Sequence, residues 1–84
     1  MLYTWFMAKI KFYASTKSIV ASDELNLKVN NLEAMLVLLK NTYPALSNIL
    51  PTCTFLVNGT ACENMLHELN DNDLVDVLPQ FSGG

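Results

Sequence analysis

One amphipathic helix constrains this sequence more than any other feature. Within residues 32–43, apolar side chains recur at spacings of three and four and form one stripe along a helix. Asn30 and Glu33 have the spacing of a capping box at its start, and Lys40 lies in its last turn, where the helix dipole favours a cation. Pro44 ends the helix, because the residue before a proline disfavours helical geometry. The stripe consists of Leu32, Met35, Leu36, Leu39 and Tyr43.

Two alternating segments precede the helix. In residues 8–14 and in residues 25–29, apolar side chains occupy every second position, which is the period of a strand that buries one face. The small and polar residues 15–23 between them predict a turn. We therefore expect a hairpin of two strands. Its inward side chains would be Ala8, Ile10, Phe12, Ala14, Leu25, Leu27 and Val29, with Lys9, Lys11 and Tyr13 pointing outward.

Three strands are expected after the helix. A loop over residues 45–51 leads into a β-rich run, residues 52–57, which ends at Asn58-Gly59, the dipeptide best suited to a type I′ turn. A short return strand follows near residues 60–62. The final strand covers residues 74–78 and ends at Pro79, because proline cannot donate to a central ladder.

The segment between the last two strands is less regular. Residues 63–70 predict a brief helical turn with Leu66 and Leu69 pointing inward, and residues 71–73 form a turn rich in Asp and Asn. The whole order is β-β-α-β-β-β. It predicts an α+β domain with one main helix packed on one face of a mixed sheet.

Size and charge limit what the domain can do. Eighty-four residues are too few for a self-contained catalytic pocket of the common kinds, and only 15% of them are charged, against about 25% in an average soluble domain. Residues 1–40 carry all five lysines and three acidic residues, whereas residues 41–84 carry five acidic residues and no Lys or Arg. This balance argues against nucleic acid as a partner and favours a protein partner with basic groups.

No targeting feature is apparent. The apolar opening, residues 1–7, lacks the cationic start of a secretory signal, and no run approaches the roughly 18 apolar residues of a membrane helix. Cys53 and Cys62 do not form a disulfide framework. We therefore expect a cytoplasmic protein that binds no membrane.

The C-terminal residues carry the most specific signal. Gly83-Gly84 has no Cβ atoms, so it can thread a narrow channel and present the carboxylate of Gly84, a reactive group that needs no pocket of its own. We expect three parts: an N-terminal extension (residues 1–6), a domain (residues 7–79) and a flexible tail (residues 80–84).

Several motifs together resemble a known family. Over about residues 7–84 the chain is similar to the small subunit of molybdopterin synthase, within the MoaD/ThiS family of ubiquitin-like sulfur carriers. Gln80 departs from the second proline that is usual in that family. The motifs are Tyr43-Pro44-Ala45-Leu46, Val57-Asn58-Gly59, Leu69-x-x-x-Asp73-x-Val75, and Leu78-Pro79 followed by Phe81-Ser82-Gly83-Gly84.

The resemblance implies a β-grasp, ubiquitin-like fold and a carrier cycle. An E1-like adenylyltransferase would use ATP to adenylate Gly84, and a sulfur donor would convert it to a thiocarboxylate. The tail, Phe81-Ser82-Gly83, would then enter the active site of the large synthase subunit and donate sulfur for the dithiolene of molybdopterin. The chain would be the non-catalytic subunit of a hetero-oligomeric sulfurtransferase, with no bound cofactor. Its partner-binding residues would be Tyr13, Leu78 and Pro79, on the sheet face turned away from the helix.

Other functions remain open. The chain could be a ubiquitin-like modifier joined through Gly84 to lysines of target proteins, or a sulfur carrier for thiamine thiazole or tRNA thiolation. A third reading is a small protein-binding β-grasp domain whose terminal glycines are incidental. The Leu78-Pro79 and Phe81-Ser82 context argues against this third reading.

Two residue clusters are weaker candidates. His67 lies near Cys62 and Glu63, but the spacing does not match tetrahedral zinc sites, so no metal site is expected. The acidic residues of the last segment suit a turn and a solvated strand face, or a docking surface for basic groups, better than hydrolytic catalysis. They are Asp71, Asp73 and Asp76.

Overall fold

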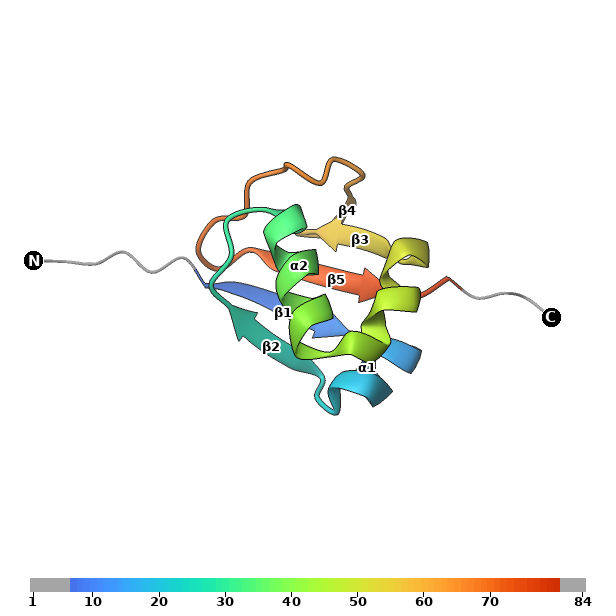
Figure 1. The fold of residues 1–84 in the computed structure, drawn as a ribbon. Coiled ribbons are helices and arrows are strands. Elements are labelled where there is room, and N and C mark those ends of the chain that lie inside the picture. Colours follow the sequence, from blue (N-terminus) through green and yellow to red (C-terminus); the bar gives the residue numbers. More distant parts are fainter. Residues whose placement is uncertain (1–6, 81–84) are drawn as a thin grey trace, which may run out of the picture.

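A mixed five-stranded sheet organises the chain (Figure 1). The computed structural model describes residues 7–80. The strand order is β2-β1-β5-β3-β4, in which β1 and β5 are parallel and the other neighbours are antiparallel. The predicted α+β class with a mixed sheet is confirmed. The strands are β1 (Ala8–Phe12), β2 (Glu24–Leu27), β3 (Thr54–Val57), β4 (Thr60–Ala61) and β5 (Leu74–Leu78).

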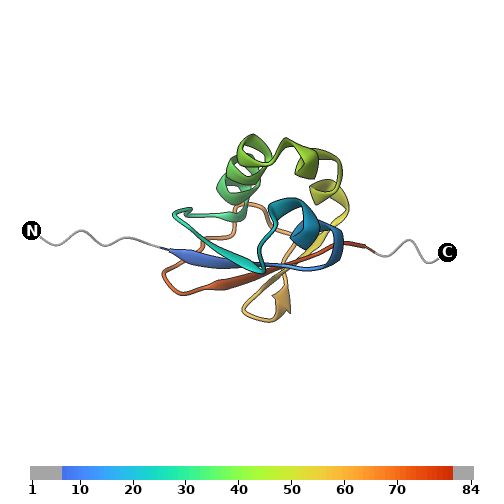
Figure 2. The ribbon, with the colours of Figure 1, turned by 90° about the horizontal axis from the view of Figure 1, so that it is seen from below.

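The helices lie on one side of this sheet (Figure 2). The main helix, α2 (Leu32–Thr42), buries Leu32, Met35 and Leu39 of the predicted stripe, while Leu36 and Tyr43 are half-buried against the core. It is 11 residues long. Within residues 7–80 there is no helix with the length and apolarity needed to cross a membrane.

The N-cap of α2 differs from the prediction by one residue. Asn31, not Asn30, caps the helix, and its Oδ1 accepts a hydrogen bond from the backbone N–H of Ala34 at 2.7 Å. The carbonyl of Asn30 instead accepts from the N–H of Leu69 at 2.9 Å. Either of the two adjacent asparagines could cap the helix, so the sequence leaves its first residue ambiguous. In the fold, the backbone of Asn30 bonds to a distant segment and Asn31 is the cap.

A short helix replaces the expected turn between the first two strands. Residues 15–23 were predicted to be a turn, but α1 (Ala14–Val20) occupies most of this segment, and Ala14 begins the helix instead of extending the strand. Thr16 is fully buried, and its hydroxyl donates to the carbonyl of Tyr13 at 2.7 Å. Burial of Thr16 and Val20 stabilises a helix too short and too polar to show an apolar stripe.

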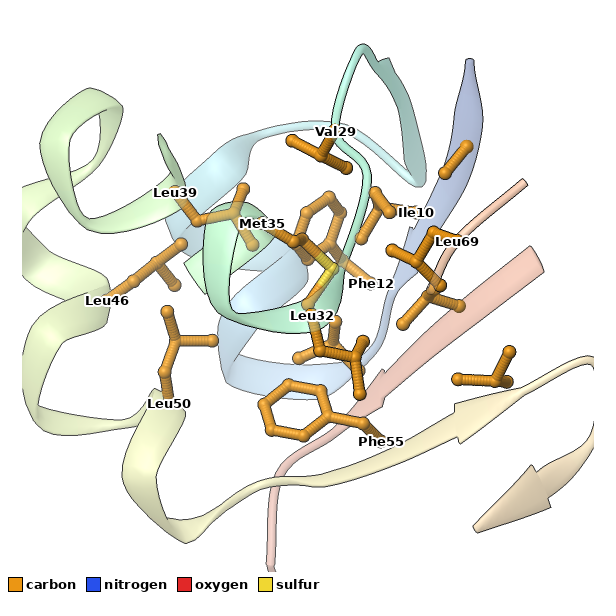
Figure 3. Close-up of a cluster of buried hydrophobic side chains, with 14 of the residues drawn as sticks. Ile10, Phe12, Val29, Leu32, Met35, Leu39, Leu46, Leu50, Phe55 and Leu69 are labelled. Atoms are coloured by element: carbon orange, nitrogen blue, oxygen red, sulfur yellow. The ribbon is translucent and has the colours of Figure 1, made fainter. Parts of the chain in front are cut away.

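Two 3₁₀ helices take the place of the expected loop after α2. They are η1 (Pro44–Asn48) and η2 (Leu50–Thr52), each with a proline in its first turn, where the missing N–H costs no hydrogen bond. Leu46 and Leu50 are buried (Figure 3). The prediction of a simple loop was therefore wrong, because this segment contributes to the core.

The turn after β3 agrees with the sequence. Asn58 has a φ of +50° and Gly59 a φ of +86°, which is the left-handed geometry that a type I′ turn requires. Both flanking strands are shorter than expected.

Residues 63–70 form an extended connection with a short turn instead of a helical one; Leu69 is buried as predicted, but Leu66 is 65% exposed.

Backbone bonds to α2 explain this extended connection. The N–H of Glu33 donates to the carbonyl of Met65 at 2.8 Å, and Asn31 forms an isolated bridge with Glu68. These groups satisfy the start of α2, so they are not available for a local helix.

One apolar cluster fills the space between the sheet and the helices (Figure 3). The alternate residues of β1, β3 and β5 face α2, η1 and η2 across it. The fully buried larger members are Ile10, Phe12, Leu32, Met35, Leu39, Leu46, Leu50, Val75 and Val77.

We expect Leu32→Ala to lower the free energy of unfolding by about 2–5 kcal/mol, because it leaves a cavity under the first turn of α2. Val37→Ala is the matched control on the same helix, since Val37 is 54% exposed, and should change stability by less than about 0.5 kcal/mol. Urea unfolding measures both. Equal effects of the two variants would contradict the assigned helix orientation.

Candidate functional site

The C-terminal exit lies beside the middle of the sheet. β5 pairs with β1 on one side and with β3 on the other, so Leu78 ends a strand held from both sides and Pro79 follows it. Because β1 and β5 are parallel, the end of β5 lies at the opposite end of the sheet from the start of β1 (Figure 1). Pro79 is half-buried and Gln80 is exposed. A rigid central strand therefore carries the chain to its exit.

The predicted tail residues cannot be placed in this geometry. Phe81, Ser82, Gly83 and Gly84 lie outside the described residues, as does the predicted extension, residues 1–6. Tyr13, Leu78 and Pro79 are all described, and they lie at the same end of the neighbouring strands β1 and β5.

The sheet face opposite the helices is uncovered within residues 7–80 (Figure 2). We call it the open face. Val75 and Val77 point into the core, so the alternating residues Leu74, Asp76 and Leu78 point the other way. The leucines of this face are half-buried, and Lys9 is the register partner of Leu74. The open face consists of Lys9, Lys11, Tyr13, Thr54, Leu56, Leu74, Asp76 and Leu78.

Tyr13 is fixed on the open face by Asp76. Its hydroxyl donates to Oδ1 of Asp76 at 2.9 Å, and this hydrogen bond raises the pKa of the phenol, with partial desolvation and the charge of Asp76 adding to the effect. The Lys11 Nζ lies 6.0 Å from the centre of the Tyr13 ring. Asp76 stands between Lys11 and Leu56 in the strand register. The face therefore combines apolar side chains with a fixed aromatic ring and charges of both signs.

Asp73 has a structural role. It accepts from the backbone N–H of Asn70 at 2.7 Å and from the side-chain amide of Asn58 at 2.9 Å, and these bonds hold its pKa below the ordinary value. Asn58 in turn accepts from the N–H of Leu74 at 2.9 Å. This network ties the β3–β4 turn to the start of β5. Asp71 accepts from the N–H of Met7 at 3.0 Å.

The cysteines and the histidine form no metal cluster. In the part of the chain that the structure describes, no three His, Cys, Asp or Glu side chains come together so that they could hold a metal ion. Both cysteines are free and half-buried, and burial raises the pKa of the Cys53 thiol. A raised pKa lowers the thiolate fraction of Cys53, so the thiol reacts slowly with electrophiles.

Comparison with models of known protein families identifies the family of this chain. The model of the ThiS family matches residues 10–84, which is most of the sequence. The chain belongs to the ThiS family. No curated protein gives a significant sequence match.

Solved structures share the fold of this ThiS-family protein. The small archaeal modifier protein 1 from Methanosarcina acetivorans has a TM-score of 0.84 at 24% identity, over 98% of this chain and 100% of its own. A chain of the complex of subunits 1 and 2 of the molybdopterin-converting factor from Helicobacter pylori has a TM-score of 0.74 at 24% identity, over 94% and 100%. Urm1 from Trypanosoma brucei has a TM-score of 0.70 at 23% identity, over 99% and 100%. The predicted β-grasp, ubiquitin-like fold of the sulfur carriers is confirmed.

Sequence reasoning missed part of the open face. The β-rich run predicts a strand that contains Thr54 and Leu56, but the structure adds that Phe55 and Val57 point inward, so Thr54 and Leu56 point outward. An outward Leu on a strand next to β5 was the available signal. The bond between Tyr13 and Asp76 joins residues 63 positions apart, so no local pattern could indicate it.

We expect stability to fall as the pH drops below about 4, near the ordinary pKa of Asp, in part because Asp73 titrates. Its pKa is lowered in the folded state, so the unfolded chain binds the proton first and acid favours unfolding. Asp73→Asn should weaken this dependence on pH. The effect on the free energy of unfolding should be less than about 1 kcal/mol, because Asp73 is exposed enough for solvent to screen its charge.

Glu63→Gln provides the control, because Glu63 is an exposed acid with no hydrogen bond or ion pair to residues 7–80. Urea unfolding between acidic and neutral pH compares the variants. An equal pH dependence of the parent and the Asp73 variant would contradict the structural role of this carboxylate.

Proposed function

We propose that this ThiS-family protein is the sulfur-carrying small subunit of a molybdopterin synthase. The observation that supports this most is the position of the exit: the central strand β5 leads through Leu78-Pro79 to Phe81-Ser82-Gly83-Gly84, beside an uncovered sheet face. A carrier needs a rigid body for docking and a slender end that reaches a partner's active site. This chain combines both.

Gly84 is the reacting group in this proposal. An E1-like adenylyltransferase joins its carboxylate to the α-phosphate of ATP and releases pyrophosphate, because a free carboxylate is a poor acyl donor and AMP supplies a leaving group. A sulfur nucleophile then displaces AMP and leaves a thiocarboxylate on Gly84. The large subunit takes this sulfur for the dithiolene of molybdopterin, and the carboxylate returns. Since activation consumes ATP, we place the cycle in the cytoplasm.

The open face is the proposed docking surface for the large subunit. Leu56, Leu74 and Leu78 supply apolar area, and Tyr13 supplies an aromatic ring of the kind enriched in interfaces. A complex of two subunits is named for the Helicobacter pylori molybdopterin-converting factor, one chain of which shares this fold. Binding through the open face leaves the exit at Pro79 next to the partner, where the tail must enter.

A second function is protein modification through Gly84. It is supported by the fold shared with the small archaeal modifier protein 1 of Methanosarcina acetivorans and with Urm1 of Trypanosoma brucei. Both functions begin with the same adenylate, and they differ in the nucleophile that follows: a sulfur donor or a lysine of a target protein. Sulfur delivery to another acceptor, such as thiamine thiazole or tRNA, shares the thiocarboxylate.

Coexpression with an adenylating enzyme and a sulfur donor tests the carrier. We expect the intact mass to rise by the difference between one sulfur and one oxygen atom, with the change located on Gly84. Deletion of Gly84 should abolish the gain and leave the melting temperature unchanged, because terminal residues make few stabilising contacts.

Three outcomes discriminate between the proposals. No mass gain, under conditions in which a known carrier is modified, would overturn the carrier function. Isopeptide-linked conjugates of higher mass would favour the modifier. A large loss of stability on deletion of Gly84 would show that the tail is structural.

Leu56→Asp should weaken binding to the large subunit by at least about tenfold, because it puts a charge into the apolar centre of the open face. Val37→Asp is the matched control, since Val37 is an exposed residue of α2 on the other side of the sheet. Titration calorimetry measures both affinities, and circular dichroism verifies that both variants fold. Equal weakening by the two variants would contradict the proposed surface.

A further inference from the structure

A pocket of about 440 Å³ lies on the side of the fold away from β1 and β2. Its lining comes from α2, η2, β3, β4 and the segment that follows β4. The side chains are mainly apolar and include Leu36, Leu50, Met65 and both cysteines. A cavity of about 150 Å³ with similar lining can hold a benzene ring. The pocket therefore has room for an aromatic side chain.

One wall of this pocket lies close to the C-terminal exit. Thr54 lines the pocket, and in the sheet it is the antiparallel partner of Leu78, the last residue of β5. Paired Cα atoms in such strands are about 5 Å apart. Figure 1 shows the end of β5 and the start of β3 side by side. The chain thus leaves the sheet one strand away from the pocket.

Phe81 is within reach of the pocket from this point. It follows Leu78 by three residues, which span at most about 11 Å when extended. Residues 79–81 can therefore cross β3 at Thr54 and bring the phenyl ring to the pocket. Phe81 is the apolar side chain of the tail, since Gln80, Ser82 and the two glycines have none to bury.

We propose that the pocket holds the ring of Phe81 when the protein is free, so that the tail docks on its own domain. Burial of the ring removes apolar surface from water, and the ordering of the few residues between Leu78 and Phe81 partly offsets this gain. Phe81 is the nearer apolar candidate, because the chain leaves β5 beside Thr54, whereas residues 1–6 join the domain at Met7, at the opposite end of the sheet.

Docking of Phe81 in the pocket would lower the fraction of molecules that can enter the proposed carrier cycle. This consequence rests on the proposed function, whereas the docking itself does not. A tail held by Phe81 cannot extend into a partner's active site. An activating enzyme or large subunit must therefore bind the undocked form, and its apparent affinity falls in proportion to the population of that form.

The first experiment uses the free protein and cysteine alkylation. Iodoacetamide reacts with Cys53 and Cys62, and peptide mass spectrometry follows each site separately. We expect Phe81→Ala to raise the alkylation rate of the pocket cysteines by about threefold or more. A threefold rise corresponds to a tail that is docked about two-thirds of the time, because only the undocked third of the molecules can then react. Gln80→Ala is the matched control, because it alters the neighbouring tail residue without removing the ring, and it should leave the rate unchanged.

The second experiment measures the Met65 methyl group directly. Four methionines give few ¹³C-methyl signals, and Met65 lines the pocket, whereas Met35 is fully buried in the core and Met7 begins the domain at the far end of β1. A docked ring should shift the Met65 signal, and Phe81→Ala should move that signal alone.

Three results would overturn the proposal. Equal alkylation rates in the parent and the Phe81 variant would do so, as would a Met65 signal that does not respond to that variant. Protection that grows with protein concentration would assign the pocket to the tail of a second copy instead. No activating enzyme is present in these experiments, so their outcome is independent of the mass gain that tests the carrier function.

Discussion

The parallel pairing of β1 with β5 is the interaction on which the rest of the structure depends. It joins strands from the two ends of the domain, with Ile10 beside Val75 and Phe12 beside Val77, all of them buried. Such a long-range pairing must offset the entropy of closing the chain between the strands, and the shared core beneath it supplies that stabilisation. Because of this pairing, the last strand lies in the middle of the sheet and is paired on both sides before the chain leaves it at Pro79.

The same arrangement separates two surfaces. Helix α2 and the 3₁₀ helices cover one side of the sheet and leave the other side open, so inward and outward residues of each central strand have different uses. Inward residues hold the core together. Outward residues, such as Leu56 and Leu78, are available for a partner at little cost to stability. The pocket beside η2 meets the open face at Thr54, which is the antiparallel partner of Leu78 at the end of β5.

Local sequence patterns are sufficient to predict the elements that interactions between neighbouring residues stabilise. The sequence predicts the apolar stripe of α2, the Asn58-Gly59 turn, the alternation of β1 and the span of β5, because each depends on residues close together in the chain. The elements that were missed are α1, η1 and η2. They are short, and what stabilises them is burial of Thr16, Leu46 and Leu50 against distant parts of the chain, which no short window of sequence contains.

For the candidate site, the sequence by itself determined the family motifs, the identity of the tail residues, and the outward position of Tyr13. These follow from residue type, spacing and the period of a strand. Only the tertiary structure decided that Tyr13 bonds to Asp76, that Leu56 joins the open face, and that the pocket borders the strand pair at the exit. The reason is that strand order and register place residues from opposite ends of the chain side by side, and this placement depends on the packing of the whole core.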